Sequence, residues 1–259
     1  MTDIQKDFAK HLDIGAVRVK NVPNFVFLCG GPVHHDKNGY RSVRHYVYDQ
    51  IASKRSDIFE RIVLAERVIQ WYHSGLYQDL LTLETDLAGL SAAIVLIVES
   101  PGSIAELGSF VLSPEISERL VVFINSDHSQ SQSFISEGPI GYFESRHPEY
   151  IFRYPWGWDA GSGCVDEGSI EPYVEEILES INLRMNEQPK EKKFDAGKSA
   201  HRILLLADLI YMYEIVRFNE ILSAFQCIIV DSTESELKKF LNILKSLNII
   251  RVQEVGRDR

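Results

Sequence analysis

Two glutamates flank a proline–glycine turn in the stretch Glu99-Ser100-Pro101-Gly102-Ser103-Ile104-Ala105-Glu106. A carboxylate can attack or stabilise an electron-poor carbon, such as the anomeric carbon of a sugar. A second carboxyl group can protonate or orient the group that leaves. The spacing places both carboxylates around the carboxyl end of an apolar strand, where open α/β sheets bind ligands, and carboxylates can do such chemistry without a metal.

The same residues also fit a purely structural interpretation. Ser103-x-x-Glu106 is the pattern of a capping box, in which the serine and glutamate side chains satisfy main-chain N–H groups at the start of a helix. The motif alone leaves both interpretations of Glu106 open.

Further candidates for substrate binding follow other apolar runs. Gly30 and Gly31 form a sharp turn that could bring main-chain N–H groups close to a ligand, and Arg44 near the start of the next helix could hold a phosphate. A simple turn and a solvated arginine explain these residues equally well. The remaining candidates lie just after strands or at the start of a helix: Glu66, Ser100, Gly102, Ser103 and Asn125.

The apolar runs that must position these residues alternate with helical patterns. This alternation predicts an α/β fold with a doubly wound, mostly parallel sheet. In such a sheet the carboxyl ends of the strands share one edge, so the candidates are expected to converge on one crevice. The expected strands are 24–29, 58–65, 93–98, 120–124 and 150–154, and the main expected helices are 40–54, 79–90, 103 onward and 170–186.

The last part of the chain has a different pattern. A polar, charged stretch at 186–198 reads as a linker. Beyond it, three amphipathic helices at about 200–216, 217–225 and 234–247, followed by a strand at 249–255, predict a small winged-helix-like domain. The expected division is 1–185 for the α/β domain, 186–198 for the linker and 199–259 for the C-terminal domain.

Composition narrows the class of protein. The net charge of −10 argues against general coating of nucleic acid, and the C-terminal domain is expected to contact protein first and nucleic acid second. No apolar run has the length to span a bilayer, and the three cysteines, Cys29, Cys164 and Cys227, fit neither a disulfide framework nor a zinc site. We expect a cytoplasmic protein with no membrane partner, no metal and no cofactor.

Four motifs together resemble one family. They are Phe27-Leu28-Cys29-Gly30-Gly31, Leu83-Glu84, Glu99-Ser100-Pro101-Gly102-Ser103 with Glu106-Leu107-Gly108, and Phe134-Ile135 with Gly138-Pro139. The chain is similar, over about residues 24–145, to the nucleoside 2-deoxyribosyltransferase-like effectors of bacterial retron anti-phage systems. The resemblance implies a flavodoxin-like fold that cleaves N-glycosidic bonds, with Glu106 as the nucleophile.

The resemblance also implies a setting. Effectors of this kind are toxic when released, through cleavage of NAD or attack on nucleotides, so NAD or a nucleotide is expected as substrate. A retron reverse transcriptase with its RNA–DNA hybrid (msDNA) is expected as inhibitor. Such sites are often completed by a neighbouring subunit, so a homo-oligomer is expected.

Three functions remain to be separated. The first is hydrolysis of the N-glycosidic bond of NAD or a related nucleotide or nucleoside, assisted by Glu99 or Glu66. The alternative is a non-catalytic module that senses a nucleotide and signals through the C-terminal domain. This alternative is motivated by Ala92, which stands where the family has an aspartate that binds the base or sugar. A phosphoribohydrolase acting on nucleoside monophosphates ranks third, since Pro101-Gly102-Ser103 matches that class only in part.

Overall fold

A computed structural model describes residues 11–20, 23–34, 39–73, 75–127, 133–187 and 191–253. Its centre is a five-stranded parallel sheet with the order β3-β2-β4-β5-β6. The strands are β2 (Val26–Cys29), β3 (Ile62–Leu64), β4 (Ala93–Val98), β5 (Leu120–Asn125) and β6 (Ile151–Tyr154). Every residue of β2, β4 and β5 is buried, as expected for strands covered on both faces.

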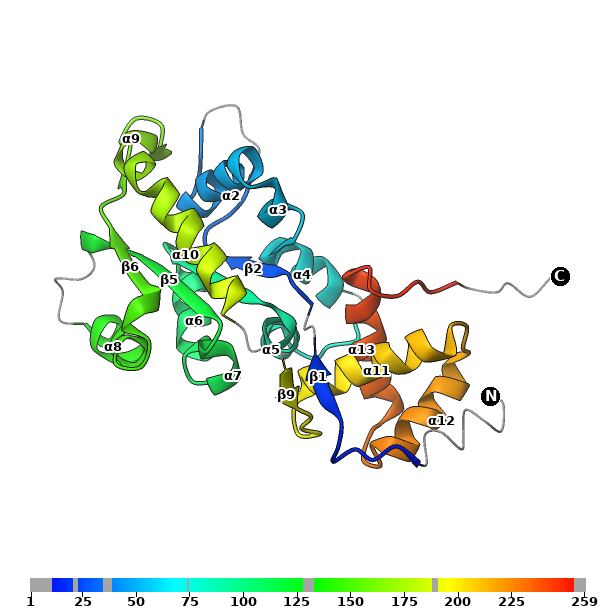
Figure 1. Ribbon diagram of the computed structural model, residues 1–259. Coiled ribbons are helices and arrows are strands. Elements are labelled where there is room, and N and C mark those ends of the chain that lie inside the picture. The colour runs from blue at the N-terminus through cyan, green and yellow to red at the C-terminus, as the bar shows by residue number, and fades with distance from the viewer. Residues whose placement is uncertain are drawn as a thin grey trace. The chain divides into compact units, whose positions relative to one another are not determined.

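Helices cover both faces of this sheet. Helix α10 (Val174–Asn186) packs on β4 and β5 and touches α2 (Val43–Lys54), and Figure 1 shows the two helices on the same side of the sheet. Helix α6 (Pro101–Phe110) packs on β4. The right-handed crossover from β4 to β5 places it on the opposite face. In chain order the strands run 2-1-3-4-5 across the sheet, which is the doubly wound order of flavodoxin-like folds. The predicted α/β fold with five parallel strands is confirmed.

Shorter elements complete this part of the chain. The helices are α3 (Ser56–Phe59), α7 (Pro114–Ser117), α8 (Gly141–Glu144), α9 (Glu167–Ile170), η2 (Ser136–Ile140), η3 (Pro148–Tyr150) and η4 (Glu171–Tyr173), and the hairpin strands are β7 (Gly157–Trp158) and β8 (Val165–Asp166). The predicted strand 58–65 is wrong at its start, because 56–59 closes a helical turn and only 62–64 pairs with β2.

Internal contacts divide the chain into two compact units. The sheet unit comprises 23–66 and 88–188, and the helical unit comprises 1–22, 67–87 and 189–259. Helix α4 (Ala65–Tyr72) and helix α5 (Leu80–Leu90) each begin in one unit and end in the other. The division into 1–185, 186–198 and 199–259 stays a prediction.

The described C-terminal part of the helical unit, residues 199–253, contains three helices as predicted. They are α11 (Ser199–Tyr213), α12 (Phe218–Ile228) and α13 (Glu234–Ser246). Two short antiparallel strands accompany them, β1 (Arg18–Lys20) and β9 (Glu191–Lys193), and β9 lies within the stretch predicted as a linker.

The predicted strand 249–255 is wrong for its described part, because residues 249–253 form no strand. After α13 the chain turns back on itself. Asn248 adopts a left-handed conformation with φ 56°, and the N–H groups of Ile249 and Ile250 donate to the carbonyl of Leu244. This is the geometry of a helix C-terminus that satisfies its last carbonyl groups locally. The described residues here, 199–253, therefore form three helices, and they do not show the predicted winged-helix domain.

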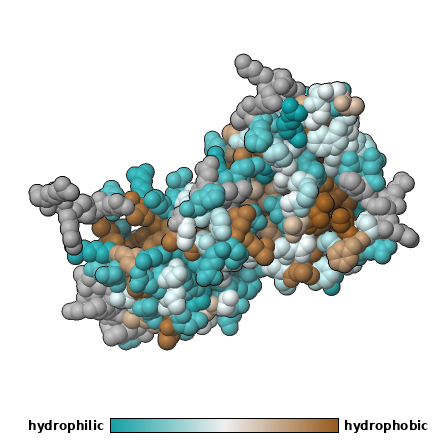
Figure 2. Space-filling view, turned by 180° about the vertical axis from the view of Figure 1, so that it is seen from behind, coloured by the Kyte–Doolittle hydropathy of each residue, from teal (hydrophilic) through white to brown (hydrophobic). Residues whose placement is uncertain are grey.

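The surface is polar with separate apolar areas. Figure 2 shows brown patches divided by teal and white ones on the face that it displays. The most exposed large apolar side chains are Phe134, Tyr211, Ile215 and Val230, each more than 80% exposed. No helix formed by the described residues combines the length and the apolar character needed to cross a bilayer.

Candidate active site at the carboxyl ends of the strands

The candidates that follow β2, β3 and β4 meet, together with the start of α2, in one hydrogen-bonded network. Its central member is Glu99, which follows β4 directly. The Glu99 carboxylate accepts three main-chain hydrogen bonds: Oε1 from Gly31 N at 3.0 Å and Arg44 N at 3.0 Å, and Oε2 from Val43 N at 2.6 Å. Burial raises the pKa of Glu99 above its usual value, while the three N–H donors pull it down. Both carboxylate oxygens are thus engaged by the first turn of α2 and the glycine turn.

The glycine turn after β2 is required by packing. Gly30 has φ 148°, and a Cβ there would lie 3.0 Å from the carbonyl oxygen of Ile97. A Cβ on Gly31 would lie 2.7 Å from the Cβ of Ser42 and 2.9 Å from Glu99 Oε1. A side chain at Gly31 would therefore displace the very carboxylate that its N–H holds.

Arg44 turns inward from α2. Its side chain is 2% exposed, forms an ion pair with Glu66 Oε1, and donates from Nη1 to the carbonyl of Leu28 at 3.2 Å. Glu66, just after β3, also accepts from Val33 N at 3.3 Å. We expected the Arg44 guanidinium group to bind a phosphate. In the structure it pairs with the carboxylate of Glu66.

Helix α6 starts two residues earlier than predicted, because Pro101 suits the first helical position and Ser100 is the N-cap. The capping box pairs Ser100 with Ser103: Ser103 N donates to Ser100 Oγ, and Ser100 N donates to Ser103 Oγ. The capping box that forms is therefore not the Ser103–Glu106 box considered as one interpretation of the motif. Glu106 lies in the second turn of α6, half-buried, while Gly102 in the first turn is exposed.

Comparison with known families decides the class of the protein. The family model described as "STM3845 retron effector protein" matches residues 40–252. The chain belongs to this family of retron effectors.

Two curated relatives agree with that assignment. The effector is 26% identical over 239 residues to the "Retron Ec73 putative ribosyltransferase/DNA-binding protein" of Escherichia coli, covering 89% of this chain and 73% of the relative. It is 26% identical over 227 residues to the "Retron Ec86 putative ribosyltransferase/DNA-binding protein" of the same species, covering 86% of this chain and 71% of the relative.

Asn125 of the effector, at the end of β5, joins two loops. Its Nδ2 donates to the carbonyl of Trp156 at 2.7 Å, and its Oδ1 accepts from Asp127 N at 2.9 Å. The side chain is 7% exposed. It contacts none of the glutamates through these bonds, so its predicted contact with substrate stays a prediction.

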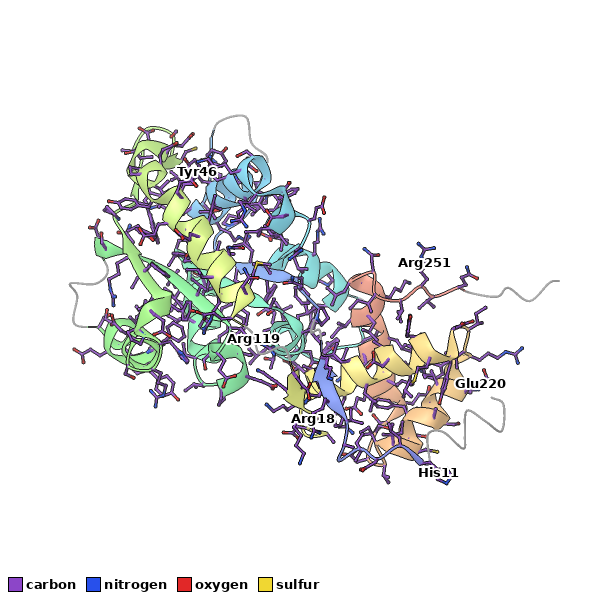
Figure 3. The ribbon with its side chains drawn as sticks, viewed as in Figure 1. His11, Arg18, Tyr46, Arg119, Glu220 and Arg251 are labelled. Atoms are coloured by element: carbon purple, nitrogen blue, oxygen red, sulfur yellow. The ribbon has the colours of Figure 1, made fainter. Side chains whose placement is uncertain are left out.

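Other polar contacts were not predicted from the sequence. Tyr46 on α2 (Figure 3) donates its hydroxyl to Glu171 Oε2 at 2.7 Å, and burial raises the pKa of Tyr46. Arg119, also labelled in Figure 3, donates to the carbonyls of Ala88 and Gly89 at the end of α5. Only tertiary structure brings these partners together, since long stretches of sequence separate them.

The helical unit of the effector buries two carboxyl groups of α5 that were not predicted as candidates. Asp86 accepts a hydrogen bond from Tyr77 Oη at 2.8 Å and another from Ser199. Glu84 is 7% exposed, and burial raises its pKa from 4.5 to about 7. The signal was present in the sequence, where acidic residues interrupt the apolar run Leu80-Leu81-Thr82-Leu83-Glu84-Thr85-Asp86-Leu87. No group of His, Cys, Asp and Glu in the described ranges is placed to hold a metal ion.

Proposed function

We propose that this retron effector hydrolyses the N-glycosidic bond of NAD or a related nucleotide or nucleoside, with Glu106 as the nucleophile. The observation that carries the proposal is the place of Glu106 beside the network of strand-end residues. Glu106 lies half-buried in the second turn of α6, three residues after Ser103, whose hydroxyl accepts a hydrogen bond from the main-chain N–H of Glu99 at 3.0 Å. The word ribosyltransferase in the names of both relatives supports the same class of chemistry.

The chemistry favours NAD within that class. A Glu106 carboxylate oxygen forms a bond to C1′ of the nicotinamide ribose, and the C1′–N bond breaks with its electron pair moving to the ring nitrogen. That nitrogen carries a positive charge in NAD, so nicotinamide leaves neutral and needs no proton. Water then attacks C1′, releases ADP-ribose and returns the carboxylate, with one proton passing to solvent.

Cleavage of a purine or pyrimidine nucleoside needs a proton donor in addition to the nucleophile. The base leaves as an anion unless a general acid protonates it. Both oxygens of Glu99 already accept main-chain N–H groups, and Glu66 pairs with Arg44 through Oε1. We therefore rank NAD above nucleosides as substrate. Among the residues proposed to bind it, Ser100 and Ser103 shape the start of α6, and exposed Gly102 leaves room for a ligand there.

The proposal is tested by inducing the effector in bacteria that lack the other retron components and measuring cellular NAD. Wild type and Glu179→Gln, an exposed glutamate on α10, should deplete NAD, while Glu106→Gln should not. Glutamine keeps the size of the side chain but cannot act as an anionic nucleophile. Intact NAD in all strains would move the search to nucleosides and nucleotides. If those were also untouched, the sensing alternative would replace hydrolysis.

We also propose that a retron reverse transcriptase with its RNA–DNA hybrid restrains the effector. Membership of a retron effector family supports a partner from the same system. Co-expression with the cognate reverse transcriptase and hybrid should protect NAD, and loss of the hybrid should restore depletion. Depletion that is unaffected by both components would contradict this proposal.

A further inference from the structure

The start of α2 forms an anion cradle, made of the main-chain N–H groups of Gly31, Val43 and Arg44. A strand, a double-glycine turn and a helix N-terminus in this order are the arrangement with which many α/β proteins hold a phosphate. Here the anion is part of the chain. The Glu99 carboxylate receives all three N–H groups at 2.6–3.0 Å.

The polar groups around the cradle are also engaged within the chain. The Ser42 hydroxyl donates to the carbonyl of Pro32 at 2.7 Å and accepts from His45 N at 3.0 Å. The Arg44 guanidinium points away to Glu66. A phosphate could reach the three N–H groups only by displacing Glu99.

The same residue is tied to the helix that carries Glu106. The main-chain N–H of Glu99 donates to Ser103 Oγ at 3.0 Å, and Ser103 lies in α6, three residues before Glu106. Glu99 thus binds Gly31 and the first turn of α2 through its side chain, and the start of α6 through its main chain. A shift of the Glu99 side chain would weaken the contacts that hold α2 and α6 in place at the end of β4.

We infer that Glu99 is an internal anion that fills the cradle at the start of α2, and that it is a positioning residue for Glu106 rather than a proton donor to the substrate. The second half of this inference rests on the proposed function. The first half concerns the folded chain alone.

The test compares Glu99→Gln and Glu99→Ala with wild type and with the matched surface variant Glu179→Ala. Glutamine replaces one of the two acceptor oxygens by an NH2 group, which only donates, so at least one cradle N–H must face an N–H of the amide. We expect the amide resonances of Gly31, Val43 and Arg44 to shift in both Glu99 variants and the melting temperature to fall. Formate, compared with chloride at equal ionic strength, should raise the melting temperature of Glu99→Ala and restore those resonances, with no comparable effect on wild type or Glu179→Ala.

Base release supplies the second measurement. A positioning role predicts that kcat falls about 10- to 100-fold in Glu99→Gln, because the nucleophile is displaced slightly, while KM changes little. The shape of the pH profile should be retained, and formate should recover part of kcat in Glu99→Ala. Loss of the acidic or basic limb of the profile in Glu99→Gln would instead identify a proton donor and overturn the positioning role.

The two parts of the inference, the filled cradle and the positioning role, can be refuted separately. Unchanged amide resonances in Glu99→Gln, or binding of inorganic phosphate at these amides in wild type, would overturn the filled cradle. If wild type released no base from any substrate, the proposed function and the positioning role would fall together. The formate result would still decide whether Glu99 fills the cradle.

Discussion

Glu84 in the helical unit should make the stability of the effector fall as pH rises. Its side chain is 7% exposed, and no hydrogen bond or ion pair joins its carboxylate to any residue in the described part of the chain. Burial without a partner disfavours the charged form and raises its pKa from 4.5 to about 7. The substitution Glu84→Gln removes the ionisation and keeps the shape.

The magnitude follows from linkage. A pKa difference of 7 − 4.5 = 2.5 units corresponds to about 3 kcal/mol as an upper bound. Because the pKa is raised in the folded state, this contribution is fully present below the unfolded value of 4.5 and is lost as pH rises through about 7. At neutral to mildly alkaline pH the buried Glu84 carboxylate becomes charged, which lowers the free energy of unfolding of the wild type. Glu84→Gln cannot ionise and keeps its stability over this range.

Urea unfolding at a series of pH values checks this expectation. Wild type and Glu179→Gln should lose free energy of unfolding between about pH 5 and pH 8, and Glu84→Gln should show a much flatter curve and greater stability at the alkaline end. Equal slopes for Glu84→Gln and wild type would refute the burial argument. A steeper slope in the variant would mean that the charged form is the stabilising one.

Three further predictions concern packing and capping. Gly31→Ala should lower the free energy of unfolding by about 1–3 kcal/mol, because the added Cβ would lie in occupied space. The control Gly108→Ala should be neutral or stabilising, because nothing lies within 4 Å of the added Cβ. Equal effects of the two substitutions would contradict this packing argument. Ser100→Ala should cost about 1 kcal/mol by removing the N-cap of α6, and an unchanged urea midpoint would argue against that cap. Tyr77→Phe should lower the free energy of urea unfolding by about 1–2 kcal/mol, because Asp86 loses a hydrogen-bond donor. The effect should vanish in an Asp86→Ala background, which removes the acceptor, and an equal effect there would contradict the pair.

The sheet could be predicted from the sequence because its central strands are almost entirely apolar. Runs such as Ala93–Val98 and the apolar part of Leu120–Asn125 have no polar face, which is typical of a short strand covered on both sides. The parallel order then follows from the alternation with helices. The described residues of the strand expected at 249–255, namely 249–253, form no strand, because alternation in an apolar run does not supply a partner strand. There Asn248 and the carbonyl of Leu244 end a helix instead.

The location of the candidate site could be predicted from the sequence, whereas its hydrogen bonds could not. The fold brings the strand ends to one edge, so Glu66, Glu99 and Asn125 could be assigned to that edge. Which of them bind each other depends on pairs far apart in the chain, such as Gly31 N and Glu99 Oε1 across 68 residues. The local pattern Ser103-x-x-Glu106 left two interpretations open, and the capping box forms between Ser100 and Ser103 because Pro101 occupies the first helical position.

Direct detection of the released base tests the central claim most closely. Purified wild type, Glu106→Gln and Glu179→Gln would each be incubated with NAD, and nicotinamide and ADP-ribose would be measured by mass spectrometry. The account predicts both products in equal amounts from wild type and Glu179→Gln, and neither from a folded Glu106→Gln. Equal release by wild type and Glu106→Gln would contradict the assignment of Glu106 as the nucleophile.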